Sequence, residues 1–282
     1  MVLSLIVADM TCIAQREYTI VKHQFCDNIN TKWEQLNTKD DISFLMIPLT
    51  ELKIDENYIL SDFRKTWNGG SATKDVSALR LYVREKGQKR PNESYFDIEY
   101  ARYLKCKKNN VVYQQEKDTT PYIWPFDKIC LSGSQMSVWQ AYLLDCSKFM
   151  FGMRNEANYD KEYLITSSED IDSLLAIICN SWESYNLRNK NDSTKINGYR
   201  AKHVNDVLIL IDSLQNIKNK RLDPIFKFQD DSVTIEHYSF LEFHGLVRRK
   251  TTLLLSQNHR QIKEIKRKSY DILAKYRHLV YF

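Results

Sequence analysis

The spacing of apolar residues changes repeatedly along the chain, and each regular stretch predicts a helix or a strand. Apolar positions three or four residues apart predict helices, because such positions share one face of a 3.6-residue repeat. This spacing is found at 25–36, 136–150, 171–182 and 204–214, the last with Val204, Val207, Leu208, Ile211 and Leu214. Ser167-Ser168-Glu169-Asp170, a capping-box arrangement, precedes the helix at 171–182. A last helix is expected over 260–277, from a seam formed by Ile262, Ile265, Ile272 and Tyr276.

Alternation of apolar and polar residues predicts strands at other places in the chain. Residues 95–116 alternate around a Lys-Lys-Asn-Asn turn, and residues 233–256 alternate around His244-Gly245, so we expect two β-hairpins. Shorter strands are expected at 42–52, 78–85 and 162–166. Since strands and helices come in blocks, we predict an α+β fold whose mixed or antiparallel sheet, built from hairpins near 95–116 and 233–256, packs against several amphipathic helices.

The length of 282 residues allows one large core or two smaller ones, since domains usually run to about 100–200 residues. We expect residues 15–282 to form a single globular α+β domain. The stretch TWNGGSATKDVS at 66–77 is the most loop-like part of the chain, and a weak domain boundary is expected there. No repeat with a period of 20–50 residues is visible.

The opening segment, MVLSLIVADMTCIAQREYTI, has two interpretations. A short apolar run is followed by small residues three and one positions before Gln15, which is the spacing that a signal peptidase recognises. We therefore interpret residues 1–14 as a signal peptide and expect a periplasmic or secreted protein. Asp9 and the lack of basic residues before Arg16 oppose this interpretation. The alternative is a buried first strand in a cytoplasmic protein.

Composition is that of an ordinary globular protein, with 43% hydrophobic and 27% charged residues and a formal net charge of +5. Basic and acidic residues are mixed along the chain, which does not indicate nucleic-acid binding. Glycine is scarce, with seven residues in all, and neither G-x-G-x-x-G nor G-x-x-x-x-G-K-[ST] occurs. A glycine-rich phosphate-binding loop is therefore excluded, and no cofactor is expected.

Six cysteines are scattered along the chain with no C-x-x-C pair, which excludes a zinc ribbon or a thioredoxin-like motif. Removal of residues 1–14 would leave five, so at least one thiol would stay free. We expect no dense disulfide framework.

The segment Pro121-Tyr-Ile-Trp-Pro-Phe126 carries the candidate contact residues, Tyr122, Trp124 and Phe126. Exposed aromatic rings would stack on a sugar or hold a peptide, because they offer a large contact area at a small cost in entropy. Buried, the same rings would close the core over the end of the 95–116 hairpin. Both interpretations stay open at this point.

Three weaker patterns support an enzyme. Glu51-Leu-Lys53, downstream of Asp40 and Asp41, is similar to the E-x-K core of metal-dependent nucleases, in which carboxylates hold Mg²⁺. Glu236, Glu242 and His244 would share one face of an unbroken strand and offer ligands to a divalent metal. The basic residues of 260–277 would face phosphate or anionic lipid, or simply lie on a solvated helix face.

These patterns are too common by chance to assign catalytic, cofactor-binding or metal-ligating residues. No transmembrane segment is visible either. We expect a non-catalytic binding or structural protein whose partner is a protein or a carbohydrate. The alternative is an intracellular metal-dependent enzyme that acts on nucleic acid.

Overall fold

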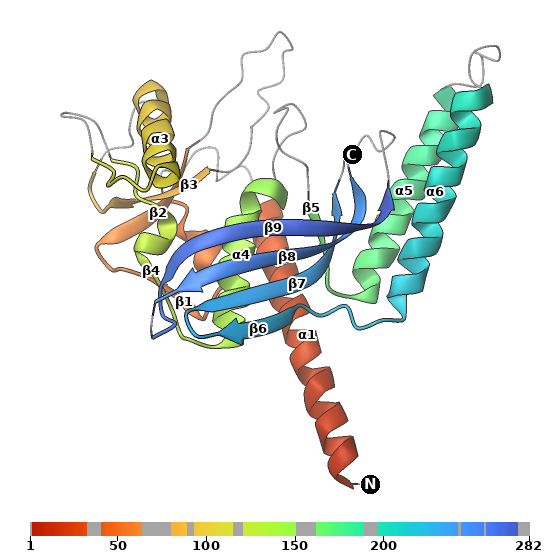
Figure 1. Ribbon diagram of the computed structural model, residues 1–282, viewed down its shortest axis with the longest axis horizontal. Coiled ribbons are helices and arrows are strands. Elements are labelled where there is room, and N and C mark those ends of the chain that lie inside the picture. The colour runs from red at the N-terminus through yellow and green to blue at the C-terminus, as the bar shows by residue number, and fades with distance from the viewer. Residues whose placement is uncertain are drawn as a thin grey trace. The chain divides into compact units, whose positions relative to one another are not determined.

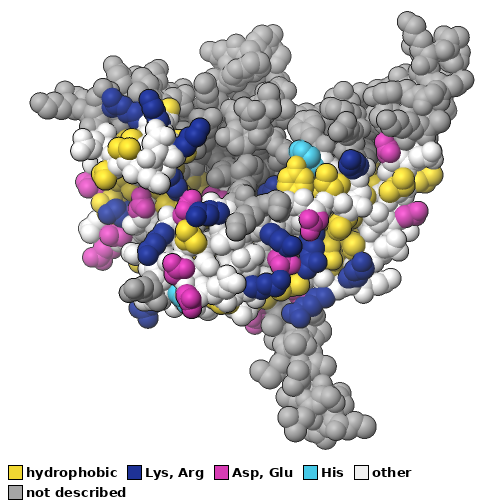
Figure 2. Space-filling model, viewed as in Figure 1, with side chains coloured by type: hydrophobic (Ala, Val, Ile, Leu, Met, Phe, Trp, Pro, Cys, Tyr) yellow, Lys and Arg dark blue, Asp and Glu magenta, His cyan; other side chains and the backbone are white. Residues whose placement is uncertain are grey.

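The computed structural model describes residues 2–32, 41–63, 80–88, 93–114, 121–150, 162–188, 197–241, 244–256 and 258–275. The chain divides into two compact units. Unit 1 comprises 1–19, 160–254 and 265–282, and unit 2 comprises 20–159 and 255–264. Helices together with antiparallel strand pairs confirm the predicted α+β fold (Figure 1). Charged side chains of both signs are interspersed on the face shown in Figure 2.

Unit 1 is built on a five-stranded sheet. Its strands are β5 (Glu162–Ile165), β6 (Ile225–Gln229), β7 (Ser232–Leu241), β8 (Gly245–Leu255) and β9 (Ile262–Lys275). β7 and β8 pair antiparallel, which confirms the hairpin predicted over 233–256. Gly245 has φ +91°, a left-handed conformation that glycine adopts without strain, and it begins β8 directly after the turn.

The edge of β7 that faces away from β8 is covered by two strands, placed end to end. Along β5, the register runs from Glu162 opposite Leu241 to Ile165 opposite Tyr238. Along β6, it begins with Ile225 opposite Glu236. β5 and β6 therefore form one interrupted strand, and the interruption lies opposite His237.

Helices α5 (Ser168–Arg188) and α6 (Asn197–Lys218) are inserted at this interruption and lie side by side (Figure 1). Their apolar faces pack together with Phe240 of β7. The buried positions repeat every three or four residues, as expected for amphipathic helices: Ile171, Leu174, Ile178, Val207, Leu210, Leu214 and Ile217. In the stripe predicted for the second helix, Val207 and Leu214 are buried, whereas Leu208 is 53% exposed.

A capping box begins α5, as its sequence predicts. The backbone N–H of Asp170 donates to the hydroxyl of Ser167 (3.3 Å), and the N–H of Ser167 donates to the Asp170 carboxylate (3.0 Å). Two backbone groups without helical partners are thereby satisfied, which fixes where the helix starts.

Unit 2 contains two short strand pairs around a buried helix. β1 (Leu52–Ile54) pairs with β4 (Ile129–Leu131), and β2 (Tyr58–Phe63) pairs with β3 (Arg80–Glu85), both antiparallel. The other elements are α3 (Glu93–Lys108), α4 (Gln135–Met150), and the short 3₁₀ helices η1 (Ser43–Met46) and η2 (Pro125–Asp127). Residues 137–144 of α4 are buried without interruption, so this helix forms the centre of the core.

The predicted hairpin over 95–116 is wrong, because residues 93–108 form helix α3. The alternation of Phe96, Ile98 and Tyr100 fits a strand, but the same stretch has no glycine or proline for 16 residues and is rich in helix-forming residues. Its length exceeds that of an ordinary strand, and length is the better criterion when both periods fit.

The predicted helix over 260–277 is also wrong, because residues 262–275 form strand β9. Pairing with β8 overrides the helical spacing of its isoleucines, since strand formation depends strongly on the tertiary context. The exposed lysines of this stretch, Lys263, Lys266 and Lys275, now lie along a strand at the sheet's edge. Charged side chains at such an edge oppose pairing with other chains.

The opening segment is helical and is not a strand. Residues 2–31 form one helix, α1 (Val2–Thr31), so the alternative of a buried first strand is wrong. Phe25 and Ile29 lie on the buried face predicted for the helix at 25–36. The predicted strand over 42–52 is replaced by η1, with only Leu52 belonging to a strand. The boundary at 66–77 falls outside the described residues, and a single domain over 15–282 stays a prediction.

Candidate functional site

The interruption between β5 and β6 is the site of a pocket in unit 1, which we call the junction pocket. Its volume is about 410 Å³. The residues that line it come from α1, from the start of α5 and from the segment that joins α6 to β6: Thr19, Thr166, Ser167, Ser168, Glu169, Lys218, Lys220, Arg221, Leu222 and Asp223. We call the side formed by Thr19 and residues 166–169 the hydroxyl wall, because it carries mainly hydroxyl groups. We call the side formed by residues 218–223 the charged wall, because it carries mainly charged groups.

The hydroxyl wall is held in place by hydrogen bonds. Thr19 Oγ1 donates to the backbone oxygen of Thr166 (3.1 Å), which ties α1 to the start of α5. The backbone N–H and the hydroxyl of Thr166 both donate to Asp170 Oδ2, at 2.8 and 3.0 Å. Hydrogen bonds to the backbone N–H of Glu169 itself and to the Ser167 hydroxyl lower the pKa of the Glu169 carboxyl, which therefore stays ionised at neutral pH.

The charged wall contains two cations that already have partners and one that has none among the described residues. Lys218 Nζ lies 2.6 Å from Asp172 Oδ1, and Arg221 Nε lies 3.2 Å from Asp223 Oδ2. Lys220 is exposed and makes no ion pair with any residue that the structure describes. Its ammonium group is therefore the cation of this pocket that remains available to a ligand.

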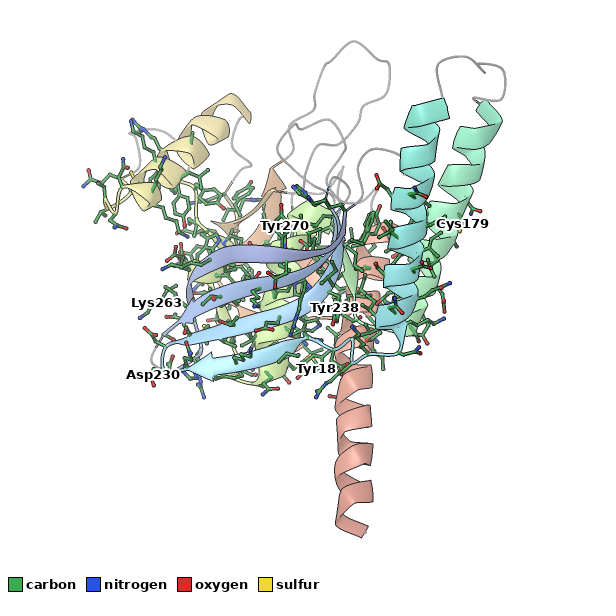
Figure 3. The ribbon with its side chains drawn as sticks, turned by 45° about the vertical axis from the view of Figure 1, so that its right-hand side comes forward. Tyr18, Cys179, Asp230, Tyr238, Lys263 and Tyr270 are labelled. Carbon is green, nitrogen blue, oxygen red and sulfur yellow. The ribbon has the colours of Figure 1, made fainter. Side chains whose placement is uncertain are left out.

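Tyr18 supports the pocket without lining it. Its ring packs against Phe226 of β6, with ring centres 5.4 Å apart, and Figure 3 shows its position on α1. Burial raises the pKa of the Tyr18 hydroxyl, and the neighbouring Asp223 raises it further. Tyr18 is therefore neutral at physiological pH and adds no charge beside the pocket.

A buried polar network crosses the sheet close to the interruption, and sequence reasoning did not find it. The Ser239 hydroxyl donates to Glu162 Oε1 (2.8 Å) and lies 3.0 Å from His237 Nδ1. Arg249 donates to the other Glu162 oxygen (2.6 Å). In a catalytic triad the histidine stands between the hydroxyl and the carboxylate. Here the hydroxyl stands between them and is 0% exposed, so the arrangement differs from that of a triad.

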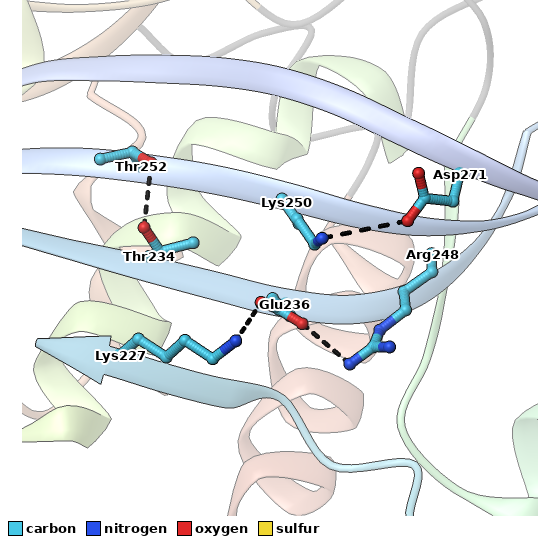
Figure 4. Close-up of polar contacts among 7 residues, drawn as sticks. All are labelled: Lys227, Thr234, Glu236, Arg248, Lys250, Thr252 and Asp271. Carbon is cyan, nitrogen blue, oxygen red and sulfur yellow. Dashed lines mark hydrogen bonds and ion pairs between the residues drawn. The ribbon is translucent and has the colours of Figure 1, made fainter.

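The sheet also carries a cluster of paired charges, in which a buried carboxylate is flanked by more exposed cations (Figure 4). Glu236 on β7 accepts hydrogen bonds from Lys227 on β6 (2.6 Å) and from Arg248 on β8 (2.8 Å). The hydrogen bond from Lys227 is the main cause that lowers the pKa of the Glu236 carboxyl. Both oxygens of this carboxylate are thus occupied by cations.

The described residues give no support to the metal site weighed at Glu236, Glu242 and His244. Glu236 is engaged by cations, Glu242 lies outside the described residues, and the His244 ring packs edge-on against Tyr270 at 5.1 Å. The strand is also not unbroken, because His244 lies in the turn before β8. Sequence parity alone therefore misplaced this histidine.

No metal-binding group of three His, Cys, Asp or Glu side chains includes Glu51 of the E-x-K pattern among the described residues, and Asp40 of the same pattern lies outside them. Glu51 accepts hydrogen bonds from the hydroxyls of Ser132 and Ser134, and Ser134 in turn caps α4 by accepting the Ser137 N–H at 2.9 Å. Lys53 is exposed on β1. Glu51 thus stabilises the start of a helix.

The aromatic segment is largely buried in unit 2. Tyr122 and Phe126 are 7% and 2% exposed, and Trp124 is half-buried. The Tyr122 ring lies 4.7 Å from that of Tyr103 on α3, so a helix covers the segment where a hairpin was expected. Lys107 Nζ lies 4.5 Å from the centre of the Trp124 ring. A role for these residues in contacting a ligand stays a prediction.

The described cysteine side chains are free thiols: Cys26, Cys106, Cys130, Cys146 and Cys179. Cys179 lies on α5 (Figure 3) and is exposed. Within the described ranges, no three His, Cys, Asp or Glu side chains gather as a metal site, and no helix is long and apolar enough to cross a membrane.

Comparison with known proteins adds no family to this picture. The chain matches no protein-family model, and no curated protein or solved structure is significantly similar to it. The functional assignment therefore rests on the geometry of the junction pocket and on the surfaces around it.

Proposed function

We propose that the protein is a non-catalytic binding protein, and that the junction pocket receives a small hydroxylated ligand with one acidic group, such as a sugar phosphate or a sugar acid. The observation that carries the proposal is the pairing of a hydroxyl wall with Lys220, whose ammonium has no described ion-pair partner. The volume of about 410 Å³ lies within the range of about 300–1,000 Å³ that is typical of small-molecule sites.

The two walls suit the two ends of such a ligand. Serine and threonine hydroxyls both donate and accept, so they match the hydroxyls of a sugar ring. The Lys220 ammonium would form a charge-assisted hydrogen bond with the acidic group, and such bonds are stronger than neutral ones. Glu169 and Asp223 disfavour additional negative charge on the ligand, so a sugar carboxylate with one charge should bind more tightly than a sugar phosphate, which carries close to two charges at neutral pH.

The alternative of a metal-dependent enzyme acting on nucleic acid is less well supported. Glu51 and Glu236, the carboxylates that suggested it, are engaged in structural hydrogen bonds. The stretch that was expected to form a basic helix in contact with phosphates is strand β9. Its lysines therefore do not form the basic helix face that was expected. These observations favour binding without catalysis.

Replacement of Lys220 by alanine should weaken ligand binding at least about tenfold, because one charge-assisted hydrogen bond contributes about 1.5–3 kcal/mol. The measurement is the thermal midpoint of the full chain with increasing glucose 6-phosphate, glucuronate or glucose. A ligand at about 100 times its Kd stabilises the folded state by about 2.7 kcal/mol. We expect the two acidic sugars, and not glucose, to raise the midpoint of the wild-type protein.

The matched control is Lys53→Ala, which removes an exposed lysine far from the pocket lining in sequence. It should leave the response to acidic sugars unchanged. No stabilisation of the wild-type protein by either acidic sugar would count against the proposal, as would equal stabilisation of the wild-type and Lys220→Ala proteins.

We also propose that the protein is exported and that residues 1–14 are its signal peptide, on the basis of the apolar run and the small residues before Gln15. Mass spectrometry of the mature protein from its native cells should then find Gln15 as the first residue. A chain that retains Met1 and fractionates with the cytoplasm would show that this proposal is wrong.

A further inference from the structure

A surface at the end of α3 in unit 2 combines exposed aliphatic side chains with lysines. We call it the α3-end surface and define it by Leu104, Lys105, Lys108, Val111 and Val112. The exposed fractions of its aliphatic residues are 46% for Leu104, 59% for Val111 and 81% for Val112. Lys105 and Lys108 are exposed too. Figure 2 shows hydrophobic and basic side chains next to each other over α3.

The backbone holds the two valines outside the helix. Asn110 has φ +52°, a left-handed conformation that ends the helix, and the Val111 N–H donates to the backbone oxygen of Cys106 (2.9 Å). The residue directly after the valines, Tyr113, packs edge-on against Tyr103 at 5.9 Å. Val111 and Val112 thus lie between two fixed points, so their exposure is built into the fold.

The charge of residues 101–114 has one sign, and the nearby Asp127 interacts with Lys107 of this stretch. Residues 101–114 contain Arg102, Lys105, Lys107 and Lys108 and no acidic residue. Lys107 is directed to the Trp124 ring, 4.5 Å away, whereas Lys105 and Lys108 make no ion pair with a described residue. Aliphatic groups that cost free energy in water therefore lie beside cations that are free to meet an anionic partner.

We propose that the α3-end surface docks the protein onto an anionic lipid bilayer, with Val111 and Val112 entering the headgroup region and Lys105 and Lys108 contacting lipid phosphates and carboxylates. A bilayer surface offers both an apolar layer and negative charge, which this pair of features requires. A nucleic acid would use the lysines and leave the valines in water. The docking is peripheral and is independent of the junction pocket.

The test is co-sedimentation of the full chain with vesicles of phosphatidylcholine alone or with about 30% phosphatidylglycerol. We expect binding to the anionic vesicles that is at least tenfold tighter than to the neutral ones and that decreases at high salt. Each of Lys105→Ala and Lys108→Ala should weaken binding about fivefold, since one lysine near such a surface contributes a factor of that size. The double variant Val111→Ser/Val112→Ser should weaken it at least as much.

The control variant is Ile47→Ser, which removes an aliphatic side chain that is 65% exposed in the same unit and outside the surface. It should bind vesicles as the wild-type protein does. The proposal is overturned if wild-type binding does not depend on anionic lipid, or if the valine variant binds like Ile47→Ser. It is also overturned if the chain binds a DNA oligonucleotide through the lysines and does not bind vesicles. All changes are at exposed positions, and circular dichroism verifies folding.

Discussion

Replacement of Glu162 by alanine should destabilise the protein by about 3–5 kcal/mol, because it leaves Arg249 with an unpaired charge in a largely buried position. The Glu162 side chain is 0% exposed and that of Arg249 is 13% exposed. The Ser239 hydroxyl also loses its hydrogen bond to the Glu162 carboxylate. The measurement is the free energy of unfolding from urea titration, followed by circular dichroism.

The double variant Glu162→Leu/Arg249→Met distinguishes the cost of leaving Arg249 unpaired from the net contribution of the ion pair to stability. Because burying two charges has a desolvation cost, replacing both by apolar side chains should recover most of the loss. Equal destabilisation by the single and double variants would show that the ion pair itself, together with the hydrogen bond from Ser239 to Glu162, contributes the stability. A loss below about 1 kcal/mol for Glu162→Ala would contradict the buried network, since that is the range of exposed pairs.

Replacement of Trp139 by alanine should also cost about 3–5 kcal/mol, because it removes the largest fully buried side chain of the core described in unit 2. Its ring stacks on that of Tyr142, with centres 5.7 Å apart, so a stacking partner is lost together with the buried area. The same urea titration measures this effect, and the remaining tryptophans report unfolding by fluorescence.

Trp124→Ala is the matched comparison. Trp124 is half-buried and contacts Phe126 and Lys107, so its removal should cost clearly less than that of Trp139. A cost equal to that of Trp139→Ala would make Trp124 a core residue and would leave the aromatic segment no role as a binding surface. A smaller cost keeps that role open to test.

Elements whose local signals agree were predictable from the sequence. Helix α5 combines a capping box at Ser167 and Asp170 with a regular apolar stripe, and both are present in the structure. The β7–β8 hairpin combines alternation with a glycine at the turn. In these elements, capping, periodicity and turn chemistry all favour the same structure, and such consistency makes a local prediction reliable.

Elements whose structure depends on distant partners were not predictable. The isoleucines of β9 fit a helix, and only pairing with β8 decides for a strand. Conversely, α3 has a strand-like alternation, but its 16 residues form a helix whose Tyr103 packs on Tyr122. In both stretches the two periods fit about equally well, so packing decided the outcome.

The junction pocket could not be predicted from the sequence, for a similar reason. Its lining comes from three places in the chain, around residue 19, residues 166–169 and residues 218–223. Only the capping box left a local signal, and that signal indicates a helix start and no ligand. The aromatic segment was identified correctly as a distinctive stretch, but burial of Tyr122 and Phe126 could not be decided before the position of α3 was known.

The interrupted strand has a consequence for the order in which unit 1 assembles. β6, β7 and β8 come one after another through short turns, so their pairing closes only small loops of chain. β5 pairs with the same edge of β7, but α5 and α6 lie between β5 and β7 in the chain. This pairing therefore closes a larger loop, which costs more entropy. We therefore expect the three-stranded meander to form first. The helical pair then brings Glu162 to Arg249, so the buried charges lose water only late in folding.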